Sequence, residues 1–235
     1  ARGPHEPEAT AVLRPCGLRV KRHTGHTGTG NGGRRGVITG FSRDARRRLL
    51  DILSTIRWDY GVGAVYFVTL TYHNEWGDWR DWKANLRAWR ERLERCYGKR
   101  LLGALWRLEF QRRGAPHFHL VLFWRAGRAP ALALFRPWVS RSWNGVIAGD
   151  VAHLRAGTNV MVARNTSGPD VSRLLHYLAK YLAKEQVAVD TATGEVIQTG
   201  RVWGVWRDLP TGESVELSMG RDAFVTLTRR LRRWG

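Results

Sequence analysis

Two strongly apolar segments that flank the tripeptide Arg112-Arg113-Gly114 constrain the fold of this chain more than any other feature. Residues 101–111 and 117–124 are rich in leucine, aromatic and β-branched side chains, which favour β-strands. Because strands joined by a short glycine-containing turn pair with each other, these segments predict an antiparallel hairpin. Further strands are predicted at 64–72, 158–164, 201–206 and 214–219, and helices at 43–57, 79–96, 130–142, 170–186 and the C-terminus. The pattern predicts an α+β fold with helices flanking a central antiparallel sheet of about five strands.

The first forty residues differ in composition from the rest of the chain. They are rich in glycine, histidine, threonine and arginine, with the densest glycine run at 25–36. Ordering so many glycines costs backbone entropy, so residues 1–40 are predicted to form a flexible basic arm. Residues 41–235 are then predicted to form one domain that ends in a basic strand and helix.

The charge of the chain indicates a polyanionic partner. Lys and Arg number 39 against 20 Asp and Glu, which gives a formal net charge of +19. Such a surface attracts nucleic acid. Phosphate contacts are predicted for the arginines Arg46, Arg47, Arg48, Arg112, Arg113 and Arg173.

Several function classes are not indicated by the sequence. No apolar run approaches the roughly 20 residues of a membrane span, and two cysteines form no disulfide framework. We therefore expect no membrane partner and a location in the cytoplasm of a bacterial host cell. The chain has no G-x-x-x-x-G-K-[ST] loop, so any strand separation is expected to need a separate host helicase.

His117 and His119 are candidate metal ligands. Residues two apart in a strand point to the same face, so both imidazoles project together. Glu109 lies in the partner strand of the predicted hairpin and could reach the same space. Two histidines and a carboxylate suit a divalent cation with open positions. The alternatives are a buried and a surface histidine with no ligand, and a Glu109 that pairs with Arg107 or Arg112.

The segment 177–184 repeats the tetrapeptide Tyr-Leu-Ala-Lys twice. At helical spacing, Tyr177, Lys180, Tyr181 and Lys184 fall on one stripe beside a stripe of leucines. Neighbouring ammonium groups favour a phenolate, which is the nucleophilic form of tyrosine. The pattern indicates tyrosine attack on a DNA phosphodiester assisted by the two lysines. The alternative is an ordinary solvent-exposed face with lysines extended into water.

Three motifs together resemble the HUH superfamily of rolling-circle replication initiators. They are Phe67–Tyr72, the segment from Glu109 that ends in Pro116-His117-Phe118-His119, and Tyr177–Tyr181. The doubled tyrosine resembles the two-tyrosine initiators of small single-stranded DNA phages and related plasmids. The resemblance covers residues 65–186 and assigns 67–71 no catalytic group.

The resemblance implies a palm-like or ferredoxin-like sheet and Mg²⁺- or Mn²⁺-dependent nicking and joining of single-stranded or hairpin origin DNA. It implies that Glu109, His117 and His119 hold the metal and that Tyr177 or Tyr181 forms a 5′-phosphotyrosine. The alternatives are a tyrosine transposase or relaxase with the same site, or a basic nucleic-acid-binding protein without catalysis. A covalent protein–DNA adduct that disappears in EDTA would exclude the last of these.

Overall fold

The computed structural model describes residues 9–23, 37–57, 61–73, 76–163, 186–190 and 193–234. Its strands are β1 (Ala9–Arg14), β2 (Gly17–Arg22), β3 (Gly40–Phe41), β4 (Val62–Thr71), β5 (Leu101–Phe110), β6 (Pro116–Arg125), β7 (Thr158–Val162), β8 (Gln186–Val187), β9 (Trp203–Trp206) and β10 (Val215–Met219). Its helices are α1 (Arg43–Thr55), α2 (Trp79–Tyr97), α3 (Leu132–Val146), α4 (Val151–Ala156) and α6 (Arg221–Trp234). No helix in these ranges is long and apolar enough to cross a membrane.

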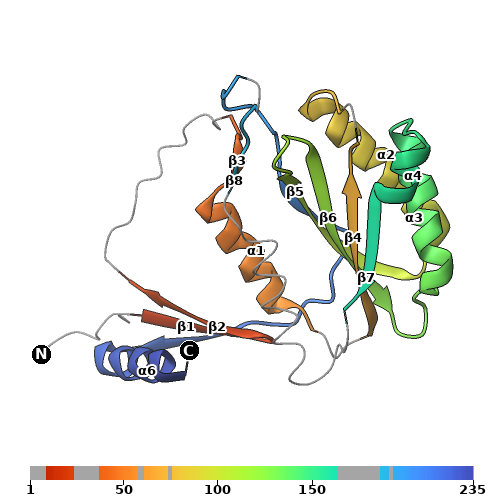
Figure 1. Ribbon diagram of the computed structural model, residues 1–235. Coiled ribbons are helices and arrows are strands. Elements are labelled where there is room, and N and C mark those ends of the chain that lie inside the picture. Colours follow the sequence, from red (N-terminus) through yellow and green to blue (C-terminus); the bar gives the residue numbers. More distant parts are fainter. Residues whose placement is uncertain are drawn as a thin grey trace, which may run out of the picture. The chain divides into compact units, whose positions relative to one another are not determined.

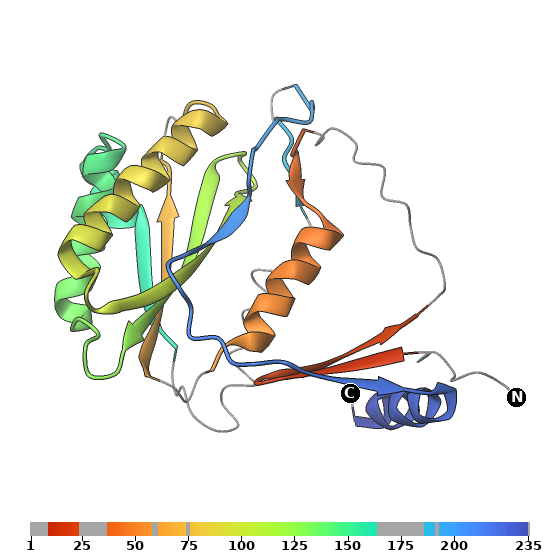
Figure 2. The same cartoon turned by 180° about the vertical axis from the view of Figure 1, so that it is seen from behind.

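The larger of two compact units, Gly36–Asp51 with Arg57–Pro210, is built on a five-stranded sheet. The strand order is β7-β4-β6-β5-β9, and every neighbouring pair is antiparallel. Helices α2, α3 and α4 lie together on one face of this sheet in both views (Figures 1 and 2). The predicted α+β fold with a central antiparallel sheet of about five strands is therefore confirmed.

The central hairpin forms where the sequence predicts it. Strands β5 and β6 pair along their whole length from Leu101 to Phe110. The turn is closed by the backbone N–H of Gln111, which donates to the carbonyl of Ala115 over 2.9 Å. Gly114 has φ +84°, a left-handed conformation that costs glycine little and other residues more. The glycine in the turn thus sets the length of the hairpin and, with it, the register of the two strands.

Helix α2 begins and packs as its sequence dictates. Asp78 caps the helix by accepting from the backbone N–H groups of Arg80 and Asp81. In return, the backbone N–H of Asp78 donates to the carboxylate of Asp81. This reciprocal arrangement satisfies donors that a helix start leaves unpaired. The buried face repeats at helical spacing and consists of Trp82, Leu86, Trp89 and Leu93. The tryptophans of the buried stripe are therefore core residues that fix the helix on the sheet.

The smaller unit contains residues that the sequence analysis assigned to a flexible arm. It comprises residues 1–35, 52–56 and 211–235, and it carries a three-stranded antiparallel sheet in the order β10-β1-β2. The prediction of a flexible arm is wrong for residues 9–22, which form the hairpin of β1 and β2. Ala9, Ala11 and Val12 are buried there, and β10, about two hundred residues later, pairs with β1. The glycine run at 25–36 lies outside the described residues.

Trp143 of α3 connects the helical layer to the end of strand β4. It is fully buried, its Nε1 donates to the carbonyl of Thr71 over 2.9 Å, and its ring meets Tyr72 edge-on. Replacing Trp143 by alanine (W143A) is expected to lower the free energy of unfolding by about 3–5 kcal/mol, because it leaves a large cavity. Urea unfolding would measure the loss.

The matched control is L134A on the same helix, since Leu134 is 70 % exposed. This substitution is expected to change the free energy of unfolding by about 0.5 kcal/mol or less. A W143A protein as stable as L134A would show that the aromatic contact between α3 and β4 does not hold the helical layer.

Candidate functional site

The candidate site lies on the sheet face opposite the one that α2, α3 and α4 cover. Phe118 of β6 contacts Trp143 of α3 with ring centroids 6.3 Å apart, so the even-numbered side chains of this part of β6 face the helices. His117 and His119 therefore project from the opposite face, because side chains alternate along a strand. This confirms that the two imidazoles share a face and that Phe118 points away from them.

Strand register brings six polar side chains into two rows on that face. In the first row, Thr71 of β4 pairs with His117 of β6, which pairs with Glu109 of β5. In the second row, His119 lies between Thr69 and Arg107. Side chains directly opposite one another in antiparallel strands are close enough to interact. Residues far apart in sequence therefore meet through register alone.

Glu109 joins the two rows. One carboxylate oxygen, Oε1, lies 2.9 Å from Nη1 of Arg107, and the other, Oε2, lies 3.1 Å from Nε2 of His119. The His117 and His119 rings meet edge-on with centroids 4.5 Å apart. The Glu109–Arg107 ion pair considered in the sequence analysis is present, and Glu109 contacts a histidine at the same time.

The two threonines lie beside the histidines. Oγ1 of Thr71 is 2.8 Å from Nδ1 of His117, and Oγ1 of Thr69 is 3.5 Å from Nδ1 of His119. Residues 67–71 were assigned no catalytic group from the sequence, and these contacts were not predicted. The one sequence feature that marks them is threonine at alternate positions of an otherwise apolar strand, which places both hydroxyls on one face.

Burial and charge set the protonation of this group. Arg107 is only 1 % exposed, and this burial lowers the pKa of its guanidinium while the charge of Glu109 opposes the shift. Burial acts to raise the pKa of Glu109, but the hydrogen bond to His119 and the charge of Arg107 outweigh it and leave that pKa below its ordinary value. Burial, reinforced by the charge of His119, lowers the pKa of His117 to about 4. At neutral pH Glu109 is therefore a carboxylate and His117 a neutral imidazole.

The donor types fit a divalent cation. A neutral imidazole held through Nδ1 keeps Nε2 for a metal, and a carboxylate is a ligand that Mg²⁺ and Mn²⁺ accept. Within the described part of the chain, no three such side chains are already gathered around a common point. His119 and Glu109 contact each other instead. The chemistry of Glu109, His117 and His119 suits a metal, and their present contacts are among themselves.

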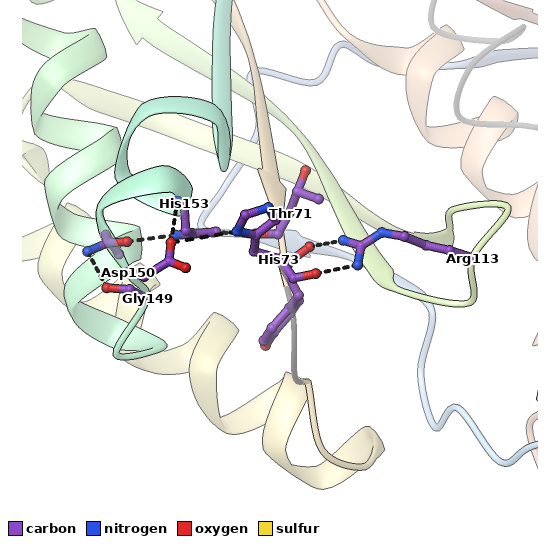
Figure 3. A network of polar contacts seen from close by, with 8 residues as sticks. Thr71, His73, Arg113, Gly149, Asp150 and His153 are labelled. Carbon is purple, nitrogen blue, oxygen red and sulfur yellow. Dashed lines mark hydrogen bonds and ion pairs between the residues drawn. The ribbon is translucent and has the colours of Figure 1, made fainter.

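A second polar cluster holds the end of β4 from the helical side (Figure 3). His153 of α4 is 2 % exposed, and its Nε2 lies 2.7 Å from the carbonyl oxygen of Thr71. Its Nδ1 lies 2.7 Å from Oδ1 of Asn144. Asp150 caps α4 by accepting from the backbone N–H of His153, and it lies 3.6 Å from Nδ1 of His73. Thr71 thus contacts the helical layer with its carbonyl and His117 with its hydroxyl.

Arg113 completes this anchor from the hairpin turn. Its guanidinium donates to the backbone carbonyls of Tyr72 and His73 (Figure 3). The same guanidinium lies over the ring of Trp76. The sequence analysis assigned Arg113 to DNA phosphates, whereas the structure shows it bound to backbone at the end of β4. The signal for this role was absent from the sequence, because the bond joins residues about forty positions apart.

The other predicted DNA-contacting residues lie in different places. Arg46, Arg47 and Arg48 are exposed on α1, where Arg47 pairs with Asp44 over 3.2 Å, and Arg112 is exposed in the hairpin turn. Tyr177, Tyr181, Lys180, Lys184 and Arg173 lie outside the described residues. The structure therefore brings together the predicted metal ligands, whereas the predicted nucleophiles rest on the sequence alone.

The lowered pKa of His117 predicts a pH dependence of stability. Between pH 6.5 and about 4 the unfolded chain binds a proton at this position that the folded chain does not. Stability is therefore complete above pH 6.5 and falls as the pH drops towards 4, by on the order of 2–3 kcal/mol. The substitution H117N is expected to remove this dependence when urea unfolding is measured in EDTA between pH 7 and about 4.5.

H73N is the matched control, because His73 is exposed and outside the His117 group. It is expected to keep the pH dependence of the unsubstituted protein. The assay stops at about pH 4.5 because the stability contributed by Glu109 is present above its ordinary pKa and is lost below it. An H117N protein that loses stability with acid as steeply as H73N would contradict the assignment.

Comparison with known proteins places the chain among replication proteins. Residues 65–186, which include all three motifs of the resemblance, match the family model of the replication-associated protein ORF2 family. The chain is 28 % identical over 207 residues to the replication-associated protein of Pseudomonas phage Pf3, with 86 % of this chain and 70 % of that protein covered.

A second relative comes from a bacterium. The chain is 26 % identical over 211 residues to a protein of Xylella fastidiosa (strain 9a5c) provisionally named as a replication protein, with 85 % of this chain and 70 % of that protein covered. No solved structure matches. On the family match, which spans half of its residues, the chain belongs to the replication-associated protein ORF2 family.

Proposed function

We propose that this protein initiates rolling-circle DNA replication by nicking and rejoining single-stranded DNA through a 5′-phosphotyrosine. The observation that carries the proposal is the row arrangement of Glu109, His117 and His119 on the sheet face opposite the helices α2, α3 and α4. The family match supports it, because the matched residues run from strand β4 through Tyr177 and Tyr181. The substrate is single-stranded or hairpin origin DNA, and strand separation is assigned to a separate host helicase.

In this proposal Glu109, His117 and His119 hold Mg²⁺ or Mn²⁺. The bound ion supplies a Lewis acid that polarises the scissile phosphate. Thr71 orients His117 through Nδ1, so that the ring nitrogen Nε2 is free to act as the ligand atom. Arg107 keeps Glu109 ionised through their ion pair. Its guanidinium carbon lies 4.4 Å from the centroid of the Phe41 ring. The chain's own residues thus fix ligand orientation and charge before DNA arrives.

The covalent step belongs to the tyrosine pair. The phenolate oxygen of Tyr177 or Tyr181 attacks the phosphorus, the bond from phosphorus to the 3′ oxygen breaks, and that oxygen leaves as a 3′ hydroxyl after taking up a proton. Lys180 and Lys184 favour the phenolate and meet the charge that builds on the phosphoryl oxygens. The reverse attack by a 3′ hydroxyl restores the phosphodiester and frees the tyrosine, so that no external energy source is needed for joining.

A denaturing gel tests the covalent step. The protein is mixed with a pool of labelled single-stranded hairpin DNAs drawn from the replicon that encodes it, with Mn²⁺ or with EDTA. The expected result is a protein–DNA band that forms with Mn²⁺ and is absent with EDTA. The double substitution Y177F/Y181F is expected to abolish the band, and Y97F, which removes a phenol elsewhere in the chain, to leave it unchanged. A band of equal strength in Y177F/Y181F would contradict the tyrosine assignment.

The metal ligands are tested by separating binding from cleavage. H117A is expected to lower the cleavage rate by at least about 100-fold, because the loss of a ligand removes several kcal/mol of transition-state stabilisation. Its affinity for the same DNA is expected to stay within about threefold, because affinity resides in the basic surface.

H73A is the matched histidine control and is expected to cleave at nearly the normal rate. Equal losses of binding and cleavage in H117A would instead make His117 a structural residue. Cleavage that is fully retained in H117A would remove the metal assignment altogether.

A further inference from the structure

A cavity of about 310 Å³ opens on the helical layer, between α2 and α3. Its lining consists of Arg92, Arg95 and Cys96 from α2 with Trp138, Arg141 and Ser142 from α3. These helices cover the sheet face opposite the one that carries the candidate metal ligands (Figure 2). The cavity is therefore separate from the site described above, and its volume is at the lower end of the range for small-ligand pockets.

Three guanidinium groups surround the cavity without a carboxylate to balance them. In the part of the chain that the structure describes, Arg92, Arg95 and Arg141 form no ion pair, whereas the nearby Arg90 pairs with Glu94 over 2.9 Å. Arg92 is held in place because its Nη1 donates to the carbonyl of Ser142 over 2.9 Å. Like charges kept together on a protein surface attract an anion, and arginine matches the geometry of phosphate.

Ser142 lines the cavity, but its hydroxyl oxygen does not open into it. The residue is 9 % exposed, and its Oγ is closed to solvent and has no hydrogen bond within the described residues. An anion in the cavity would therefore be bound by the guanidinium groups, whose geometry favours a phosphate as the ligand group.

Trp138 supplies a flat apolar surface next to these charges. Its ring is half-buried and held by Tyr97, which meets it edge-on with centroids 5.0 Å apart, and by Phe135, which lies nearly parallel at 5.8 Å. A rigid indole beside arginines is the combination with which proteins bind a base and its phosphate in single-stranded DNA. An acidic peptide would use the charges but has no flat ring for Trp138 to stack on.

We propose that this cavity binds one nucleotide unit of single-stranded DNA, with its phosphate on the arginines and its base on Trp138. The protein would then contact DNA on both sides of its sheet. A DNA strand held at α2 and α3 would stay bound while another segment of DNA occupies the face that carries Glu109, His117 and His119. The proposal requires no cleavage, so it is tested with DNA that lacks an origin and in EDTA.

Cys96 reports directly on occupancy of the cavity. Its thiol is exposed and lines the cavity, and the second cysteine, Cys16, lies in the smaller unit with its Sγ hydrogen-bonded to the carbonyl of Ile56. Iodoacetamide labelling of both thiols is followed by peptide mass spectrometry, with and without an oligonucleotide of about ten thymidines. The expected result is at least about fivefold slower labelling of Cys96 and an unchanged rate at Cys16.

Three results would overturn the proposal. The first is no protection of Cys96 at an oligonucleotide concentration that saturates binding. The second is equal protection by thymidine monophosphate or inorganic phosphate at the same concentration, which would make the ligand a free nucleotide or anion. The third is equal protection by polyglutamate, which would assign the cavity to an acidic protein segment. None of these outcomes bears on tyrosine cleavage, and failure of the cleavage assay leaves the Cys96 result intact.

A charge-matched pair of variants tests the arginines. R95Q/R141Q removes two exposed cations from the cavity, and R128Q/R155Q removes two exposed cations elsewhere in the same unit. Loss of two phosphate contacts is expected to reduce the slope of log affinity against log salt by about 1.4 for single-stranded DNA. The control pair is expected to change the slope by less than half as much, and equal changes would show that only net charge matters.

Trp138 is tested by W138F and W138L. Leucine is expected to weaken oligonucleotide binding about tenfold because it cannot stack on a base, and phenylalanine is expected to retain most of the affinity. Circular dichroism and the melting temperature confirm that each variant is folded. Equal affinities for W138L and W138F would remove the stacking role.

Discussion

The register of strands β4, β6 and β5 is the constraint on which the rest of the candidate site depends. Thr71, His117 and Glu109 come from three strands and meet only because they are cross-strand partners. A shift of one residue in either pairing would turn one set of side chains to the helical face. Gly114 in the hairpin turn and the buried rows on the helical side hold this register.

The end of β4 contacts side chains on both faces of the sheet and so links the candidate site to the helical layer. The carbonyl of Thr71 accepts from Trp143 and lies beside His153, while its hydroxyl reaches His117. Arg113 binds the next two carbonyls from the hairpin turn. The helical layer and the turn therefore fix the position of a side chain that itself orients a candidate metal ligand. His117 is therefore oriented before any ligand binds, which favours ordered metal ligation.

Local pattern in the sequence was enough to predict the parts of the structure that depend on neighbours along the chain. The hairpin, the shared face of His117 and His119 and the helix at 79–96 follow from turn chemistry and side-chain period. The burial of Arg107 and the role of His153 could not be predicted, because Phe41 and Thr71, which they contact, lie more than sixty residues away. The β1–β2 hairpin was missed for the same reason, since its neighbour in the sheet, β10, lies about two hundred residues later. The tyrosine pair lies outside the described residues, and its role rests on the sequence and the family match.

Anomalous diffraction from crystals of the protein grown with Mn²⁺ tests the central claim most directly. The account predicts one strong anomalous peak on the sheet face opposite α2, α3 and α4, bounded by Glu109, His117 and His119. It also predicts that the present contact between Glu109 and His119 opens as both turn to the metal. A peak elsewhere, such as beside His73 and Asp150, or an unchanged Glu109–His119 contact with no peak, would contradict it.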